Sequence, residues 1–279
     1  MTIRIVTDST CDLPANLVQQ YGITVVPLYI QFGEQTFLDG VDISRQEFYQ
    51  RLPTSRVQPT TATPGVDTFK NIYQRLAESG AREIVSLHIS ESLSATVNVA
   101  RQAAAEFRSI PVQVLDSQQL SLGTGLLALA AAQAAQAGQS MAELVTLIEE
   151  RTRRTHVFAA LETMEFLRRS GRMSGVVTRL GNLLRIKPLL KMNRGEPTAE
   201  RVRTQKRALD RLVQLVTALG PLEQLALVHT NARQTADELY HKARHLFPGD
   251  EKPLVVDVTP ILGAHLGPGV IGFACVQKP

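Results

Sequence analysis

The segment at residues 84–101, IVSLHISESLSATVNVAR, constrains the fold more than any other part of the sequence. It begins with apolar, strand-forming residues and passes through a run of hydroxyl residues into a helical pattern. A strand that leads directly into a helix is the unit from which parallel sheets are built. The free N–H groups at such a helix start can bind an anion. A helix cap at Ser92 or Ser94 explains the same residues without a ligand.

Strands alternate with helices through the first half of the chain, which predicts an α/β fold with a parallel sheet. The expected strands there are residues 2–7, 24–32, 84–89 and 112–115. The second half instead shows a hairpin pattern around Arg194-Gly195, together with further strands, and indicates a mixed sheet. We therefore expect two α/β domains, residues 1–154 and residues 155–279.

Small polar residues recur in the turns that follow the strands. These turns are Asp8-Ser9-Thr10, residues 60–63, residues 90–96, and Asp116-Ser117 with Ser121. Hydroxyls can donate to an anion, and ligands of parallel sheets bind beyond the carboxyl ends of the strands. Each turn alone is also a normal helix start, with Thr63 before Pro64 as one example. In the second half, Arg172 follows a glycine turn and is placed to reach across a cleft. His265 lies in a glycine-rich segment that we expect to be a loop, where the glycines let a ligand approach the backbone, although a histidine hydrogen-bonded within the loop explains it equally well.

Composition narrows the class of protein. Of the 279 residues, 44% are hydrophobic and 20% charged, which suits a folded domain pair. The net charge of +4 is spread without a dense basic block, and the chain has no Trp, so we do not expect nucleic-acid binding. The start has no signal-peptide pattern, and the two cysteines, Cys11 and Cys275, form no disulfide framework. We expect a cytoplasmic protein.

Taken as a whole, these segments resemble the DegV family of bacterial lipid-binding proteins. The resemblance covers essentially the full length and rests on motifs in the right order: DSTCDLP at residues 8–14, PTTATP at 59–64, ISESLSAT at 89–96, DS at 116–117 through Gly125, LRRSGRM at 167–173, KPLL at 187–190, and the glycine-rich segment 263–272. It implies a two-domain DegV-like fold with a long-chain fatty acid, such as palmitate, stearate or oleate, held between the domains.

The resemblance also implies a function and a set of site residues. Family members serve as the non-catalytic binding subunit of a fatty acid kinase, whose catalytic subunit forms acyl phosphate with ATP and Mg²⁺ during phospholipid metabolism. Thr61, Ser94 and His265 match the family's contacts to the fatty acid carboxylate, and Arg172 matches an entrance residue that docks the kinase. The chain itself would need no cofactor or metal, and transient contact with a membrane surface is compatible with this role.

This sequence departs from the family pattern at two positions. Ala62 stands where many relatives carry a serine hydroxyl, so one donor is missing, and Ala95 replaces a frequent glycine at the helix start.

Two other functions fit part of the sequence. An enzyme acting on a small anionic substrate could use Asp8, Asp116 and His265 as acid and base groups. A basic nucleic-acid-binding regulator would bind DNA in a salt-dependent way.

Overall fold

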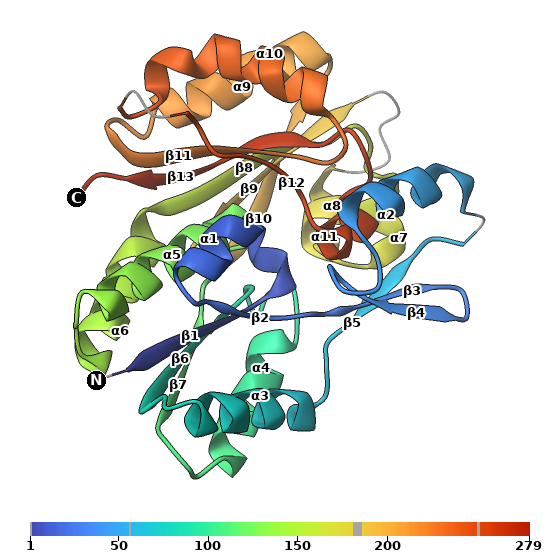
Figure 1. Ribbon diagram of the computed structural model, residues 1–279. Helices are drawn as coiled ribbons and strands as arrows, with labels where there is room; N and C mark the ends of the chain where they lie inside the picture. The colour runs from blue at the N-terminus through green and yellow to red at the C-terminus, as the bar shows by residue number, and fades with distance from the viewer. Residues whose placement is uncertain (1, 56, 181–185, 250–251) are drawn as a thin grey trace.

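The computed structural model describes residues 2–55, 57–180, 186–249 and 252–279 (Figure 1). The first half contains a parallel sheet in the order β2-β1-β6-β7, as the alternating pattern predicted. Its strands are β1 (Ile3–Asp8), β2 (Thr24–Val26), β6 (Glu83–His88) and β7 (Val112–Asp116). All four run in one direction, so their carboxyl ends meet at a single edge of the sheet.

Helices cover both faces of this sheet. Apolar side chains of α3 (Val66–Glu78) and α4 (Thr96–Glu106) pack on one face around the buried residues Phe69 and Tyr73. The other face meets α5 (Leu122–Gln136), which is buried along almost its whole length. Short α1 (Ala15–Gln20) follows the 3₁₀ turn Ser9–Cys11. Alanine-rich α5 is apolar on all sides because it lies between two sheets (Figure 1).

The second sheet is mixed, in agreement with the expectation, and has the order β10-β9-β8-β13-β11-β12. Only β11 and β12 run parallel; the other neighbours are antiparallel. Helices α9 (Gln205–Thr217) and α10 (Arg233–Ala243) cover its outer face at the top of Figure 1. The strands are β8 (Thr155–Ala160), β9 (Lys187–Asn193), β10 (Glu196–Val202), β11 (Leu222–His229), β12 (Val255–Asp257) and β13 (Ile271–Gln277).

The expected single strand at residues 24–32 is wrong. The chain leaves the parallel sheet after β2, and β3 (Tyr29–Phe32) instead pairs antiparallel with β4 (Gln35–Leu38) and β5 (Thr60–Ala62). Pro27 lies at the break, and proline has no backbone N–H to continue a ladder. The result is a separate three-stranded sheet that places Thr61 beside the larger sheets.

Several helix starts also differ from expectation. Pro64 does not begin a helix and Thr63 caps none: α3 starts after Gly65, with no side-chain cap. The N-cap of α4 is Ala95, although Ser94 Oγ accepts a hydrogen bond from the Thr96 N–H at 3.3 Å. By contrast, the Ser44 side chain caps α2 (Arg45–Arg51), and α6 (Met141–Arg154) begins with a capping box of Ser140 and Glu143. The side chains of Thr63, before α3, and of Ser94, before α4, are therefore available for other contacts.

Helix α11 (Pro260–Leu266) replaces the loop expected around His265. It begins with Pro260 at its first turn and packs against α2 and the three-stranded sheet through Ile261 and Ala264. Short helix α7 (Glu165–Ser170) lies beside it and is followed by α8 (Ser174–Leu180), which was also not expected (Figure 1). These elements bring residues from the end of the chain against the segment around Thr61.

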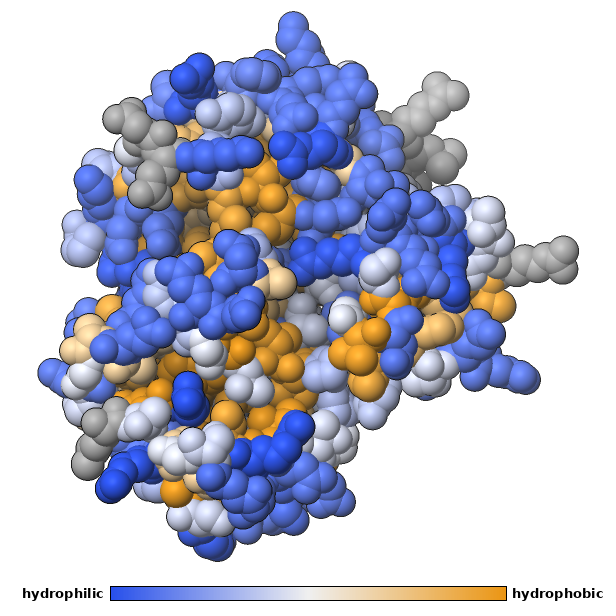
Figure 2. All heavy atoms as spheres, in the orientation of Figure 1, coloured by the Kyte–Doolittle hydropathy of each residue, from blue (hydrophilic) through white to orange (hydrophobic). Residues whose placement is uncertain are grey.

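The layers are joined by a continuous apolar core. Its largest cluster includes Val85 and Leu87 of the parallel sheet, Leu127 of α5, and Val157 and Leu190 of the mixed sheet. On the face shown in Figure 2, apolar atoms are visible mainly in recesses between the layers, and the surrounding rims are hydrophilic. The domain boundary after residue 154 stays a prediction, since this cluster contains residues from both sides of it. Among the described helices, none is long and apolar enough to cross a bilayer.

Candidate functional site

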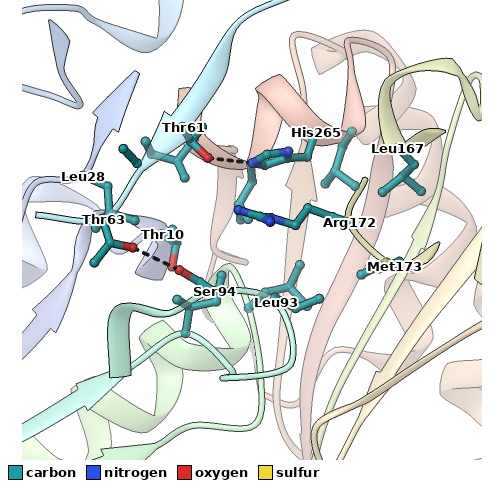
Figure 3. Close-up of a pocket in the computed structure, with 16 residues that line it drawn as sticks. Thr10, Leu28, Thr61, Thr63, Leu93, Ser94, Leu167, Arg172, Met173 and His265 are labelled. Carbon is teal, nitrogen blue, oxygen red and sulfur yellow. Dashed lines mark hydrogen bonds between the residues drawn. The ribbon is translucent and has the colours of Figure 1, made fainter. Parts of the chain in front are cut away.

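A cavity of about 60 Å³ lies where β5, the turn before α4, helix α7 with the turn that follows it, and helix α11 meet (Figure 3). Polar groups line one part of its wall and aliphatic side chains line the rest. All four residues expected at a fatty acid head group, Thr61, Ser94, Arg172 and His265, line this one cavity. The other lining residues are Thr10, Leu28, Ala62, Thr63, Ile89, Leu93, Leu120, Leu167, Met173, Ile261, Leu262 and Leu266.

Thr61 and His265 form a direct pair across 204 residues of sequence. The Thr61 Oγ1 atom lies 2.8 Å from His265 Nε2. Thr61 is placed by β5, whereas His265 projects from α11, which packs on the same sheet. Burial, together with the nearby Arg172 guanidinium, lowers the pKa of His265 to about 4. The imidazole is therefore neutral at pH 7 in the free protein.

Three hydroxyls meet at the start of α4. Ser94 Oγ lies 2.8 Å from Thr96 Oγ1, and Thr63 Oγ1 lies 3.1 Å from Thr96 Oγ1 and 3.5 Å from Ser94 Oγ. Figure 3 shows Ser94 and Thr63 facing Thr61 and His265 across the cavity. Each hydroxyl can both donate and accept, so this cluster can rotate its protons toward a bound anion. The helix start adds partial positive charge at the same place.

Arg172 supplies the positive charge of the cavity. It follows Gly171, whose positive φ of 67° ends α7 and turns the chain. The side chain is exposed as a whole, yet its guanidinium points into the space between the Thr61–His265 pair and the hydroxyl cluster (Figure 3). Within the described part of the chain it forms no ion pair. An anionic group in the cavity would therefore meet an arginine that has no competing carboxylate.

Thr10 is a lining residue that the sequence reasoning did not single out from its turn. Its hydroxyl donates to Asp8 Oδ1 at 2.5 Å, and Asp8 Oδ2 accepts from the Ile89 N–H at 3.0 Å. His88 Nδ1 lies 3.1 Å from the same carboxylate oxygen. Burial alone would raise the pKa of Asp8, but these bonds, led by His88, hold it below its usual value. Asp8 is thus an ionised structural acceptor that fixes Thr10.

The residues of the enzyme hypothesis do not come together. Asp8 is fully buried and engaged with Thr10 and His88, and neither Asp8 nor Asp116 lines the cavity that holds His265. Asp116 follows β7 and accepts from the Gln118 N–H at 2.8 Å. Among the described residues, no cluster of three or more His, Cys, Asp or Glu side chains could hold a metal ion.

Both departures from the family pattern lie close to the cavity. Ala62 lines it directly, so its methyl group occupies wall that a hydroxyl would make polar. Ala95 occupies the N-cap of α4 with an ordinary φ of −73°, a conformation that does not require glycine. Ala95 therefore leaves the position of Ser94 at the helix start intact.

Comparison with known proteins identifies the family. Residues 2–278 match the model described as uncharacterised protein, DegV family. The chain belongs to the DegV family. A DegV domain-containing protein of Streptomyces coelicolor is 39% identical over 99% of both chains, and one of Mycobacterium tuberculosis is 36% identical over 99% of this chain and 98% of the relative.

Solved DegV structures share this fold over the whole chain. The Thermus thermophilus DegV family protein, described for its fatty acid binding, is 33% identical with a TM-score of 0.90 over 100% of both chains. DegV of Bacillus subtilis, described as a fatty acid binding protein, is 28% identical with a TM-score of 0.89 over 100% of both chains. The fold expected from the resemblance, a parallel-sheet part followed by a mixed-sheet part, is confirmed.

Proposed function

We propose that this chain binds a long-chain fatty acid, such as palmitate, stearate or oleate, with its carboxylate at Thr61, Ser94 and His265. The observation that carries the proposal is a single cavity in which hydroxyls, an imidazole and a guanidinium line one part and leucines and isoleucines line the rest. The fatty acid binding described for the Thermus thermophilus and Bacillus subtilis relatives supports this class of ligand.

The energetics assign different tasks to the two ends of the ligand. Burial of a CH₂ group contributes about 0.8 kcal/mol, so a sixteen-carbon tail offers on the order of 10 kcal/mol before ordering costs. A hydrogen bond to a charged group contributes about 1.5–3 kcal/mol. The tail therefore supplies most of the affinity, and the polar groups decide which end of the ligand faces Arg172.

The tail needs more room than the cavity now provides. The volume of the cavity is about 60 Å³. An apolar cavity that holds benzene measures about 150 Å³. Lining side chains such as Leu120, Leu262 and Leu266 must therefore move when the ligand enters, and they adjoin the core cluster between the two sheets. We propose that the tail extends into this apolar layer.

We further propose that the chain is the non-catalytic subunit of a cytoplasmic fatty acid kinase. A separate catalytic subunit would bring ATP and Mg²⁺ and form the acyl phosphate, and Arg172 at the exposed end of the cavity would contact that subunit. Arg172→Ala should then reduce acyl phosphate formation more than it reduces fatty acid binding. Arg169→Ala is the control, because Arg169 is exposed and paired with Glu165.

Ligand identity and the head-group contacts can be tested together. Lipid extraction and mass spectrometry of the purified protein should detect long-chain fatty acid. Thr61→Val and Ser94→Ala should each weaken palmitate binding by about 10- to 100-fold, the loss of one charged hydrogen bond. Thr60→Val and Ser92→Ala are matched controls: Thr60 is exposed and bonds Gln31, Ser92 bonds Ser90, and neither lines the cavity.

Two results would contradict the proposal at different points. Absence of both co-purified lipid and measurable palmitate binding would overturn the ligand class. Normal binding in both Thr61→Val and Ser94→Ala would overturn the head-group assignment and leave the ligand class in place.

A further inference from the structure

His265 occupies an unusual electrostatic position. Among the described residues that line its cavity, none carries a carboxylate, and the one charged group is the Arg172 guanidinium. Its Nδ1 atom is buried and has no hydrogen-bond partner among the described residues, whereas Nε2 is paired with Thr61. The imidazole therefore has one nitrogen free to take a proton and no negative neighbour to stabilise the charge.

The carboxylates of α7, α2 and the Ser9–Cys11 turn are engaged by their own partners. On α7, Glu165 pairs with Arg169, and on α2, Glu47 pairs with Arg51. The carboxylates near the Ser9–Cys11 turn are held by their own partners, Asp8 by His88 and Asp12 by Arg45. Arg168 on α7 is exposed and, like Arg172, positively charged. A bound carboxylate would therefore be the first negative charge inside this cavity.

Protonation of His265 would also set the direction of the Thr61 hydrogen bond. A neutral imidazole can either donate to or accept from the Thr61 hydroxyl, whereas an imidazolium can only donate. Once Nε2–H donates to Thr61 Oγ1, the Thr61 proton must point elsewhere. The cavity lies on that side, so a protonated His265 makes Thr61 a donor to the ligand.

We propose that His265 takes up a proton when a fatty acid carboxylate binds, and that the resulting imidazolium turns the Thr61 hydroxyl toward the carboxylate. This inference rests on the proposed fatty acid function. A carboxylate that accepts from Thr61 lies about 4–5 Å from His265 Nε2, because Thr61 Oγ1 is 2.8 Å from that nitrogen. At such a separation and an effective dielectric constant of about 20, the carboxylate favours the imidazolium by about a thousandfold.

The size of this effect decides the pH range. In the free protein the pKa of His265 is about 4, lowered by burial and by Arg172. A thousandfold stabilisation of the imidazolium brings the titration of His265 in the complex close to neutral pH. At pH values between the free-state pKa and neutrality, binding of the ligand is therefore coupled to the uptake of a proton. Affinity should then tighten by up to about tenfold for each pH unit between pH 7.5 and pH 5.5.

Calorimetry measures proton uptake directly. Palmitate binding is titrated at pH 6 in two buffers with different ionisation enthalpies, and the difference in heat gives the number of protons taken up. We expect about one proton per bound palmitate in the wild type and none in His265→Gln, which retains a side-chain amide but cannot titrate. His245→Gln, altered outside the cavity, should behave as the wild type.

Two more measurements locate the proton. Side-chain NMR should show the His265 ring neutral in free protein at pH 6 and protonated with palmitate bound, with His241 and His245 as internal references. The matching fatty alcohol should bind without proton uptake. Bound palmitate without proton uptake, or uptake that persists in His265→Gln, would overturn this inference and leave the fatty acid function standing. If palmitate does not bind at all, the proposed function itself fails.

Discussion

Gly125 allows α5 to lie directly on the turn that carries Thr10. A Cβ atom at this position would lie less than 3.0 Å from the Cys11 backbone oxygen and 3.1 Å from Leu13 Cγ. Real Cβ atoms essentially never approach that closely, and a backbone oxygen cannot rotate away as a side chain can. Cys11 lies between Thr10, which lines the cavity, and Asp12, so any shift is transmitted to the site.

Gly125→Ala should therefore destabilise the protein although alanine is the better helix former. Helix propensity favours the substitution by about 1 kcal/mol. Overpacking of a well-filled core costs about 1–3 kcal/mol, and contact with fixed backbone places this site at the upper end. The free energy of unfolding should fall by about 1–2 kcal/mol, and palmitate affinity should fall as Thr10 is displaced.

Gly175→Ala provides the control. Gly175 is also helical, in α8, and a Cβ there would meet nothing within 4 Å. That variant should be as stable as wild type or gain up to about 1 kcal/mol. Urea unfolding followed by circular dichroism gives both values, and a displacement titration gives the affinities. If Gly125→Ala matches the wild type in stability and in binding, the close approach of α5 to Cys11 does not position the site.

Two further substitutions test the buried polar groups. Burial raises the pKa of Asp12 to about 6, so the folded state binds a proton between about pH 6 and pH 4 that the unfolded state still releases. As pH falls through the whole window the wild type should gain up to about 3 kcal/mol of stability, of which about 1.4 kcal/mol falls between pH 7.5 and pH 5. Asp12→Asn should lack this gain in urea unfolding at these two pH values, and an equal pH dependence of the two proteins would count against the prediction. Tyr73→Phe removes a 2.9 Å hydrogen bond to buried Ser86 and should lower the free energy of unfolding by about 1 kcal/mol. Palmitate affinity should stay unchanged, and a change in that affinity would contradict a purely structural role for Tyr73.

The parallel sheet followed from the sequence because its signals are local. Apolar strands that end in polar turns and lead into helices predicted β1, β6 and β7, and the Arg194-Gly195 turn predicted the β9–β10 hairpin. The run at residues 24–32 was misread because its apolar character continues through Pro27, where the chain changes sheets. Which sheet a strand joins depends on distant partners, and no local pattern carries that information.

The prediction of a loop around His265 was wrong for a different physical reason. Its glycines suggested conformational freedom, but two of them permit close packing of α11. A Cβ on Gly263 would meet the Tyr49 hydroxyl at 2.5 Å, and one on Gly267, which has φ +76°, would lie less than 3.0 Å from the Phe166 ring. The neighbours that explain these glycines come from α2 and α7, far away in the sequence.

The head-group residues were found from sequence only through their family motifs, and their pairing required the fold. Thr63 was expected to cap a helix, yet its hydroxyl joins Ser94 and Thr96 at the cavity. The apolar wall could not be assigned at all, because a leucine that lines a cavity has the same local pattern as one that fills a core.

Helix α11 belongs to the second half of the sequence but is fixed to the first. The Thr259 N–H at its start donates to Asp12 Oδ1 at 2.7 Å, and the Tyr49 hydroxyl donates to the Val258 carbonyl at 3.0 Å. Because α11 also packs on the sheet that carries Thr61, the Thr61–His265 pair is held on one unit. Room for a fatty acid tail can therefore come from rotation of lining side chains, those of Leu262 and Leu266 on α11 included, without a shift of the α11 backbone. The pair can then keep its 2.8 Å geometry while the ligand enters.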